Sequence, residues 1–225
     1  MSGFVVAIDG PAGAGKSTVS KRVAEALGFA MVDTGALYRC VALRAMGSGL
    51  AADDNEGLGE LAVGLDIAFE TTASGNRVFI DGAEVTGDIR NPEVSSWASK
   101  VSAQPAVRAA LLEQQRRLGS KPPGAVLEGR DIGTVVFPAA DLKVFLTASP
   151  AERARRRAGD LEAAGETVDL AALEAQIRER DARDAGRAHA PLKQAEDAME
   201  LISDELSIDG VVERIVGWAR ARGAQ

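Results

Sequence analysis

The sequence predicts an α/β protein with three layers, in which helices cover both faces of a parallel sheet of about five strands. Short apolar runs alternate with amphipathic helical segments along most of the 225 residues, a pattern typical of such a sheet. A glycine-rich loop follows the first apolar run, and alternating polarity at about 63–90 predicts a small antiparallel β insert. With 46% hydrophobic residues, the chain can bury the core of one domain that carries an insert.

The composition narrows the classes of function. The net charge of −7 argues against nucleic acid or an anionic membrane as the main partner. The one cysteine, Cys40, excludes an internal disulfide framework, and the one histidine, His189, leaves little room for a histidine-based triad. The first strand begins close to residue 1 with no visible signal peptide, and no apolar run approaches the ~20 residues that cross a bilayer. We therefore expect a cytoplasmic protein.

The loop GPAGAGKST at residues 10–18 directly follows the first predicted strand, Phe4–Asp9. It matches G-x-x-x-x-G-K-[ST], the phosphate-binding loop or P-loop. Its glycines let the backbone adopt positive φ and curl its N–H groups around an anion. Lys16 offers a mobile positive charge for the β- and γ-phosphates, and the hydroxyl of Ser17 can bind Mg²⁺. The apolar spacing that follows predicts a helix over 17–27 whose N-terminal dipole points at the phosphates.

Polar residues follow the second predicted strand, at 29–32, and open a helix that ends near Gly47. Thr34, Tyr38 and Arg39 should therefore lie at the carboxyl edge of the sheet, where open α/β sheets bind ligands. The alternative is that Thr34 only caps the helix and that Arg39 is an ordinary surface charge.

The segments 65–70 and 77–81 alternate apolar and polar residues around a turn, and a shorter strand is predicted at 83–85. This meander is too short to fold alone, and we interpret it as an insert that contacts a second substrate.

Two helices should follow the insert, from Pro92 to about 101 and from Pro105 to about 118. Ser99 and Arg108 lie between their apolar stripes and could face a ligand. The later strands are predicted at 125–128, 142–147 and 199–203, and a last helix at 207–222. The third strand runs into Gly129-Arg130-Asp131, which again places charges at the carboxyl edge.

Arginines form two clusters after the fourth strand. A capping box at 149–152 opens a helix in which Arg153, Arg156 and Arg157 share a face. A glycine-containing tip at 159–167 should be mobile, and Asp169 should cap the next helix. That helix carries Arg180, Arg183 and Arg187 at spacings of three and four, with Arg180 able to pair with Asp184. A solvated, salt-bridged helix explains one such cluster, whereas two clusters around a flexible tip favour an arginine lid.

Phosphoryl transfer fits this set of residues, because it requires positioning and charge neutralisation rather than a histidine or cysteine nucleophile. One arginine on the transferring group can supply a rate factor of ~10³ to 10⁵, and a closing lid keeps water away. So many arginines predict two phosphorylated substrates.

Five motifs, in order and along nearly the whole chain, resemble the bacterial cytidylate kinases: GPAGAGKST, DTGALYR, IRNPEVS, GRDIGTVVFP and RERDARDAGRAHAPL. The resemblance implies transfer of the ATP γ-phosphoryl group to CMP or dCMP with Mg²⁺, giving ADP and CDP or dCDP. It implies small nucleotides as partners, without nucleic acid or membrane, and a monomer. It also implies three parts: a core (1–33, 119–150 and 190–225), a monophosphate-binding part (34–118) that includes the insert, and a lid (about 151–189).

The resemblance further implies roles for single residues. Those that bind ATP would be Gly10, Pro11, Ala12, Gly13, Ala14, Gly15, Lys16, Ser17 and Thr18, with Ser17 also the metal ligand. Those that bind CMP would be Thr34, Tyr38, Arg39, Ser99, Arg108, Arg130, Asp131 and Asp184. Those acting on the transferring phosphoryl group would be Lys16, Arg130, Arg180, Arg187, Arg153 and Arg157. In this mapping Asp131 and Asp184 suit the sugar hydroxyls, and the cytosine edge would be met by Ser99, Arg108 and Arg130.

Several alternatives stay open. Either Glu128 or Asp131 could orient metal-bound water, and the arginine of 153–157 that touches adenine or phosphate is undecided. A GTP-binding switch would need an N/T-K-x-D run after a strand, which the sequence lacks. A P-loop kinase for another small acceptor, such as UMP, AMP or shikimate, would have no need for the insert and the GRD turn.

Overall fold

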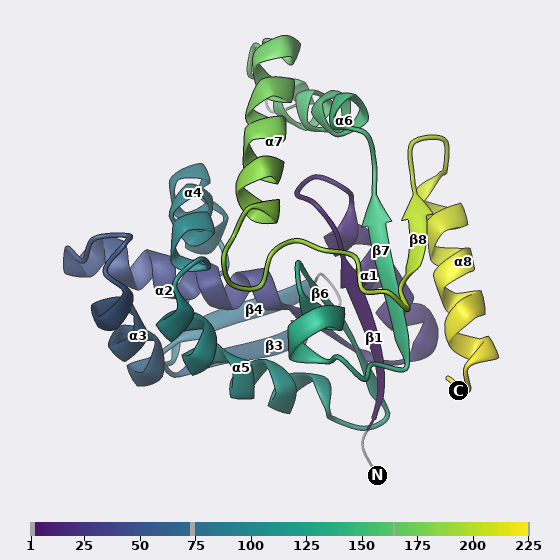
Figure 1. Ribbon diagram of the computed structural model, residues 1–225, viewed down its shortest axis with the longest axis horizontal. Coiled ribbons are helices and arrows are strands. Elements are labelled where there is room, and N and C mark those ends of the chain that lie inside the picture. Colours follow the sequence, from purple (N-terminus) through teal and green to yellow (C-terminus); the bar gives the residue numbers. More distant parts are fainter. Residues whose placement is uncertain (1–2, 73–74, 164, 225) are drawn as a thin grey trace.

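A five-stranded parallel sheet forms the centre of the computed structural model, which describes residues 3–72, 75–163 and 165–224 (Figure 1). Its strand order is β2-β6-β1-β7-β8, which confirms the predicted parallel α/β sheet. The strands are β1 Phe4–Asp9, β2 Ala30–Asp33, β6 Gly124–Gly129, β7 Leu142–Thr147 and β8 Met199–Ile202. All five carboxyl ends therefore lie at one edge of the sheet.

Helices surround the sheet in the order α1 Lys16–Leu27, α2 Thr34–Ser48, α3 Asn55–Gly64, α4 Pro92–Val101, α5 Pro105–Gly119, α6 Pro150–Ala163, α7 Leu170–Ala185 and α8 Ile208–Ala221. A 3₁₀ turn covers Asp88–Arg90, and a π-helical turn covers Ile132–Val136. No described helix is long and apolar enough to cross a membrane.

The two faces of the sheet bury different helices, because successive strand side chains point to opposite faces. Val6 and Ile8 of β1 pack with α1 and α8, while Val5 and Ala7 pack with the π-helical turn and with α5. The central strands β1 and β6 are apolar up to the acidic residues at their carboxyl ends, Asp9 and Glu128, as parallel strands covered on both faces should be. This layering fixes the carboxyl edge as the exposed end on which loops can build a site.

A second hydrophobic core holds the chain between β2 and β6. It joins α2, α3, α4 and α5 to the predicted insert, a separate antiparallel sheet of β3 Ile67–Thr72, β4 Gly75–Ile80 and β5 Ala83–Glu84. Asn76 of the insert donates a hydrogen bond to the carbonyl of Met31 in β2 (2.9 Å), and Gln114 of α5 donates to the carbonyl of Ile67 (2.7 Å). These bonds connect the insert to the edge strand and to α5.

Helix α3 was not predicted, because its sequence is rich in glycine and has low intrinsic helix propensity. Packing explains why it forms. A Cβ built on Gly59 would lie 2.6 Å from the Cβ of Ala106 in α5, so the glycine lets the two helix backbones approach closely. Asp54 caps the helix by accepting a hydrogen bond from the N–H of Gly57 (2.9 Å).

Helices α6 and α7 stand together beyond the carboxyl ends of β1 and β7 (Figure 1). We call this pair the lid helices. The expected tip at 159–167 is shorter than predicted, because α6 continues to Ala163. Asp169 caps α7 as predicted, accepting from the N–H groups of Ala171 and Ala172. Because α7 ends at Ala185, Arg187 lies just beyond it rather than on its surface.

Two glycine substitutions should shift stability in opposite directions. Gly59→Ala should lower the free energy of unfolding by about 1–3 kcal/mol, because the new methyl group overlaps Ala106 and separates α3 from α5. Gly217→Ala, in the middle of α8 with no atom within 4 Å of the added Cβ, should raise it by up to about 1 kcal/mol. Urea unfolding measures both, and equal shifts of the two midpoints would contradict the close packing of α3 and α5.

Candidate active site

The phosphate-binding loop sits tightly at the carboxyl end of β1. A Cβ on Gly10 would lie 1.9 Å from the carbonyl oxygen of Leu146 in β7, so only glycine fits there. Gly13 and Gly15 have φ of +78° and +84°, which confirms that the loop uses left-handed backbone conformations. Gly15 caps α1 without a side-chain hydrogen bond, so the first N–H groups of that helix remain available to an anion.

Lys16 reaches back across the loop, where its Nζ donates to the carbonyl of Pro11 at 2.7 Å. The side chain is buried, and no described carboxylate forms an ion pair with it. Burial lowers the pKa of Lys16, and the nearby Arg130 guanidinium lowers it further. The loop therefore holds a lysine whose positive charge a bound phosphate would stabilise.

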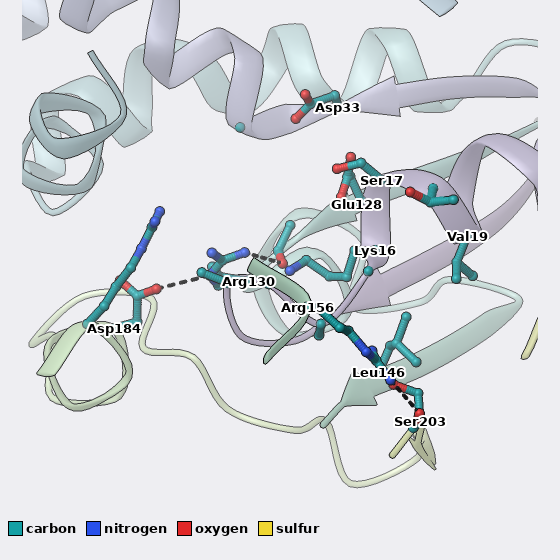
Figure 2. A pocket seen from close by; sticks show the side chains of 18 of the residues that line it. Lys16, Ser17, Val19, Asp33, Glu128, Arg130, Leu146, Arg156, Asp184 and Ser203 are labelled. Carbon is teal, nitrogen blue, oxygen red and sulfur yellow. Dashed lines mark hydrogen bonds and ion pairs between the residues drawn. The ribbon is translucent and has the colours of Figure 1, made fainter. Parts of the chain in front are cut away.

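Glu128, at the end of β6, lies beside Ser17 at the start of α1 (Figure 2). Burial raises the pKa of Glu128, and the charge of Asp33 raises it further, while Lys16 and a hydrogen bond from Ser17 lower it. Its Oε1 is buried and lacks a hydrogen-bond partner among the described residues. An unpartnered carboxylate oxygen next to a hydroxyl is the kind of oxygen donor set that Mg²⁺ accepts.

Asp9 ties this region to the turn after β6. Its two carboxylate oxygens accept hydrogen bonds from the N–H groups of Ile132 (2.8 Å) and Gly133 (2.7 Å). Burial raises the pKa of Asp9 to about 6, although these two bonds oppose the shift. The π-helical turn that follows Arg130 and Asp131 is thereby fixed against β1.

Two polar clusters form the other end of the site. In the first, Arg108 of α5 forms an ion pair with Asp131 and donates to the carbonyl of Ser102 (3.1 Å). The Arg108 guanidinium lies over the ring of Tyr38, 5.6 Å from its centre. Both partners of the ion pair are almost completely buried, with exposed side-chain fractions of 11% and 7%.

The second cluster is centred on Asp184 of α7, which is buried. Its carboxylate accepts from Arg130 (3.0 Å; Figure 2). It also accepts from Arg187 (2.6 Å). Arg187 also donates to the carbonyl of Ser99 (3.4 Å). The predicted Arg180–Asp184 pair is not formed; the buried Nε of Arg180 has no hydrogen-bond partner within the described parts of the chain. Burial lowers the pKa of Arg180, with Arg130 adding to the effect.

The structure does not support the alternative in which Thr34 only caps α2 and Arg39 is an ordinary surface charge. Asp33, rather than Thr34, caps α2 by accepting from the N–H of Ala36 (3.1 Å). The Thr34 hydroxyl is buried and donates to the carbonyl of Glu128 (2.7 Å), while Arg39 pairs with Asp33. Both residues are thus integrated into the carboxyl edge rather than displayed to solvent.

One cavity of about 1040 Å³ joins the phosphate-binding loop, Glu128, Thr34, Arg39 and the two polar clusters. The predicted site residues that line it are Ala12, Gly13, Ala14, Gly15, Lys16, Ser17, Thr18, Thr34, Tyr38, Arg39, Ser99, Arg108, Arg130, Asp131, Arg180, Asp184 and Arg187. Gly10 and Pro11 do not line it, because they lie behind the loop against β7.

The structure does not bring Arg153 and Arg157, which were predicted to act on the phosphoryl group, into this cavity. Arg153 is buried behind the phosphate-binding loop, where its guanidinium bonds to Ala12, Ala148 and Asp181. Arg157 is exposed on α6 outside the cavity. Their spacing along the helix indicated a shared face but not which residues that face would meet.

Arg155 and Arg156 line the cavity instead. Arg156 donates to the carbonyl of Ser203 (2.6 Å) and to its hydroxyl (3.2 Å) (Figure 2). It also donates to Glu152 (2.8 Å). Residues 203–208 complete this end of the cavity. Sequence reasoning missed residues 203–208 because they reach the cavity only through the pairing of β8 with β7, which no local pattern reveals.

Comparisons with known proteins agree with this geometry. The family model described as cytidylate kinase matches residues 6–221. A protein of a Geobacter species, named cytidylate kinase, is 50% identical over 224 residues, covering 100% of this chain and 96% of its own length. Another so named, from Syntrophotalea carbinolica, is 50% identical over 213 residues, covering 95% and 90%. A solved structure of an uncharacterized protein from Eubacterium ventriosum shares the fold, with a TM-score of 0.52 at 10% identity over 97% of this chain and 99% of its own.

Asp184→Asn should destabilise the protein, because it leaves Arg130 and Arg187 without their shared carboxylate and close to Arg180. We expect the free energy of unfolding to fall by roughly 3 kcal/mol. Adding inorganic phosphate should raise the thermal midpoint of this variant by more than it raises that of the wild type. Asp160→Asn, which alters an exposed carboxylate lining the same cavity, should stay within about 0.5 kcal/mol. A variant as stable as the wild type would contradict the central place of Asp184.

Proposed function

Since the chain belongs to the cytidylate kinase family, we propose that it transfers the γ-phosphoryl group of ATP to CMP or dCMP, giving ADP and CDP or dCDP. The observation that carries this proposal is one continuous cavity with a phosphate-binding loop at one end and paired arginines and aspartates at the other. Lys16 of the loop is close enough to Arg130 and Arg180 of the second cluster for their charges to act on it, so a transferring phosphoryl group would pass among these three cations.

The donor end suits a nucleoside triphosphate. The loop of residues 12–18 offers N–H groups and the start of α1 to the phosphates, while Val19, Leu146 and Ile208 offer apolar contacts farther along the cavity. Arg156, fixed by Ser203, lies beside this apolar part. We therefore assign Arg156, rather than Arg153, to the adenosine part of ATP.

Ser17 and Glu128 would hold the Mg²⁺ that accompanies ATP. Among the described residues, no group of three or more His, Cys, Asp or Glu side chains could bind a metal alone, which suits Mg²⁺ because it is commonly held by one or two protein ligands and by phosphates. The ion would supply neutralisation of phosphate charge. Of the two carboxylates left open by the sequence, Glu128 is favoured because Asp131 is engaged by Arg108.

The acceptor end suits a cytosine base and a sugar. An aspartate beside an arginine presents an acceptor and donors together, which complements the amino group and the acceptor atoms of cytosine. We therefore assign Arg108 and Asp131 to the base, with Tyr38 and Ser99 beside them, and Asp184 to the sugar hydroxyls. This moves Asp131 from the sugar to the base, because its ion pair directs it toward Arg108.

The reaction itself requires little from the protein beyond position and charge. Lys16 would follow the γ-phosphoryl group, and Arg130, Arg180 and Arg187 would neutralise the acceptor phosphate and the transferring group. Arg180 is suited to this role because its Nε has no described partner to give up. Closure of the lid helices would exclude water.

This proposal gives each part of the chain a role. The sheet with α1 and α8 (1–33, 119–150 and 190–225) would bind ATP, residues 34–118 would bind the acceptor, and residues 151–189 would close over both. A monomer located in the cytoplasm remains a prediction.

Phosphorylation of different acceptors tests the assignment. With ATP and Mg²⁺, ADP release should be fastest with CMP or dCMP and much slower with UMP and AMP, because the Arg108–Asp131 pair matches the cytosine edge. ADP formed without acceptor gives the background. Turnover of UMP or AMP equal to or faster than that of CMP would overturn the assignment.

Lys16→Met should lower kcat by about 10² to 10³, because Lys16 follows the phosphoryl group, while CMP binding should change little. Lys21→Met is a matched control on the same helix, since Lys21 is exposed and pairs only weakly with Glu25 (3.9 Å). Steady-state kinetics with CMP calorimetry would separate the two effects. Loss of CMP binding in the Lys16 variant would contradict the assignment of the two ends of the cavity to donor and acceptor.

A further inference from the structure

The Arg153 guanidinium joins three segments that are far apart in the sequence. Its Nε donates to the carbonyl of Ala148, just after β7 (2.9 Å), and one terminal nitrogen donates to the carbonyl of Ala12 in the phosphate-binding loop (3.0 Å). The terminal nitrogens also bind both carboxylate oxygens of Asp181 in α7, at 3.0 and 2.5 Å. Only 3% of the Arg153 side chain is exposed, so nearly all of its bonding is to the protein.

We propose that Arg153, clamped by Asp181, is a positioning residue that orients the phosphate-binding loop and couples it to α7. Only the coupling between acceptor binding and the loop rests on the proposed function. It gives Arg153 a role behind the loop and none in contact with the reacting groups.

The bond to Ala12 determines which way one peptide of the loop faces. In a planar trans peptide the C=O and the next N–H point in opposite directions. Because the Ala12 carbonyl points to Arg153 behind the loop, the N–H of Gly13 points to the cavity side. Arg153 therefore holds one of the backbone donors toward the place where phosphates would bind.

The stem of Arg153 also supports the loop from behind. A Cβ on Gly13 would lie 3.5 Å from the Cβ and 3.8 Å from the Cγ and Cδ of Arg153, which is ordinary van der Waals contact. The turn at Gly13 therefore rests on the aliphatic part of the side chain. A displacement of Arg153 would move the loop as well.

Helix α7 supplies the partner of Arg153 on one face and the charges of the cavity on another. Arg180 and Asp184, four residues apart, line the cavity, whereas Asp181 lies about 100° farther round the helix and does not. A movement of α7 that follows binding at Arg180 or Asp184 must carry Asp181 with it. Since leaving the buried Arg153 unpaired is unfavourable, the loop follows, and coupling of this kind acts equally in both directions.

Calorimetry on variants of Asp181 tests the proposal, because Asp181 is a quarter exposed and its replacement can be tolerated. Asp181→Asn should weaken the affinity for ADP alone about tenfold. It should also abolish most of the tightening of ADP binding that CMP produces in the wild type, which we expect to be fivefold or more. Asp181→Glu, which restores the charge, should recover much of both effects.

Glu179→Gln is the matched control, because Glu179 is an exposed carboxylate on the same helix that pairs only loosely with Arg183 (3.8 Å). It should leave ADP affinity and coupling as in the wild type. The thermal midpoint of each variant, measured without ligand, separates a loss of fold from a loss of positioning. Asp181→Asn with wild-type ADP affinity, or with wild-type coupling, would overturn the proposal.

The design distinguishes this inference from the proposed function. If CMP neither binds to nor is phosphorylated by the wild type, the proposed function fails. The measurement with ADP alone then still decides whether Asp181 and Arg153 position the loop.

Discussion

A buried carboxylate at the end of β1 holds the two halves of the cavity together. Asp9 is the last residue before the phosphate-binding loop, and it accepts two backbone N–H groups from the turn that follows Arg130 and Asp131. The donor loop and the acceptor-side charges are therefore positioned relative to one another through one side chain. Desolvation of this carboxylate is costly, and the two hydrogen bonds offset that cost only while the turn remains in place.

The charges of the site are balanced internally on a chain that is acidic as a whole. Asp184 compensates Arg130 and Arg187, and Asp131 compensates Arg108. Lys16 and Arg180 form no ion pair with a carboxylate among the described residues. An incoming phosphate would therefore stabilise their positive charges most. Electrostatic groups arranged before the substrate arrives need little reorganisation during reaction, and here the fold holds them in a largely buried setting where charge interactions are strong.

Much of the fold was predictable because its signals are local. Apolar runs, caps and the glycine-rich loop located the sheet, the insert and most helices, and the carboxyl-edge rule placed Thr34, Arg130 and Asp131 near Lys16. Helix α3 was missed because its stability comes from close packing of Gly59 on α5 rather than from propensity.

The positions of Arg153 and Arg156 show what the sequence alone does not predict. The spacing of the lid arginines revealed a shared face, but the burial of Arg153 depends on Asp181 and Ala12, and the position of Arg156 depends on Ser203. Asp9 escaped notice because its partners are more than 120 residues away. All of these contacts join residues far apart in the sequence, so no local pattern encodes them.

The bond from Asn76 to Met31 has a consequence for solubility. Strand β2 is an edge of the central sheet, and an uncovered edge strand can pair with a second chain and start aggregation. The side chain of Asn76, in β4 of the insert, occupies one carbonyl group of that edge strand. A second chain that paired with β2 would therefore have to displace this bond.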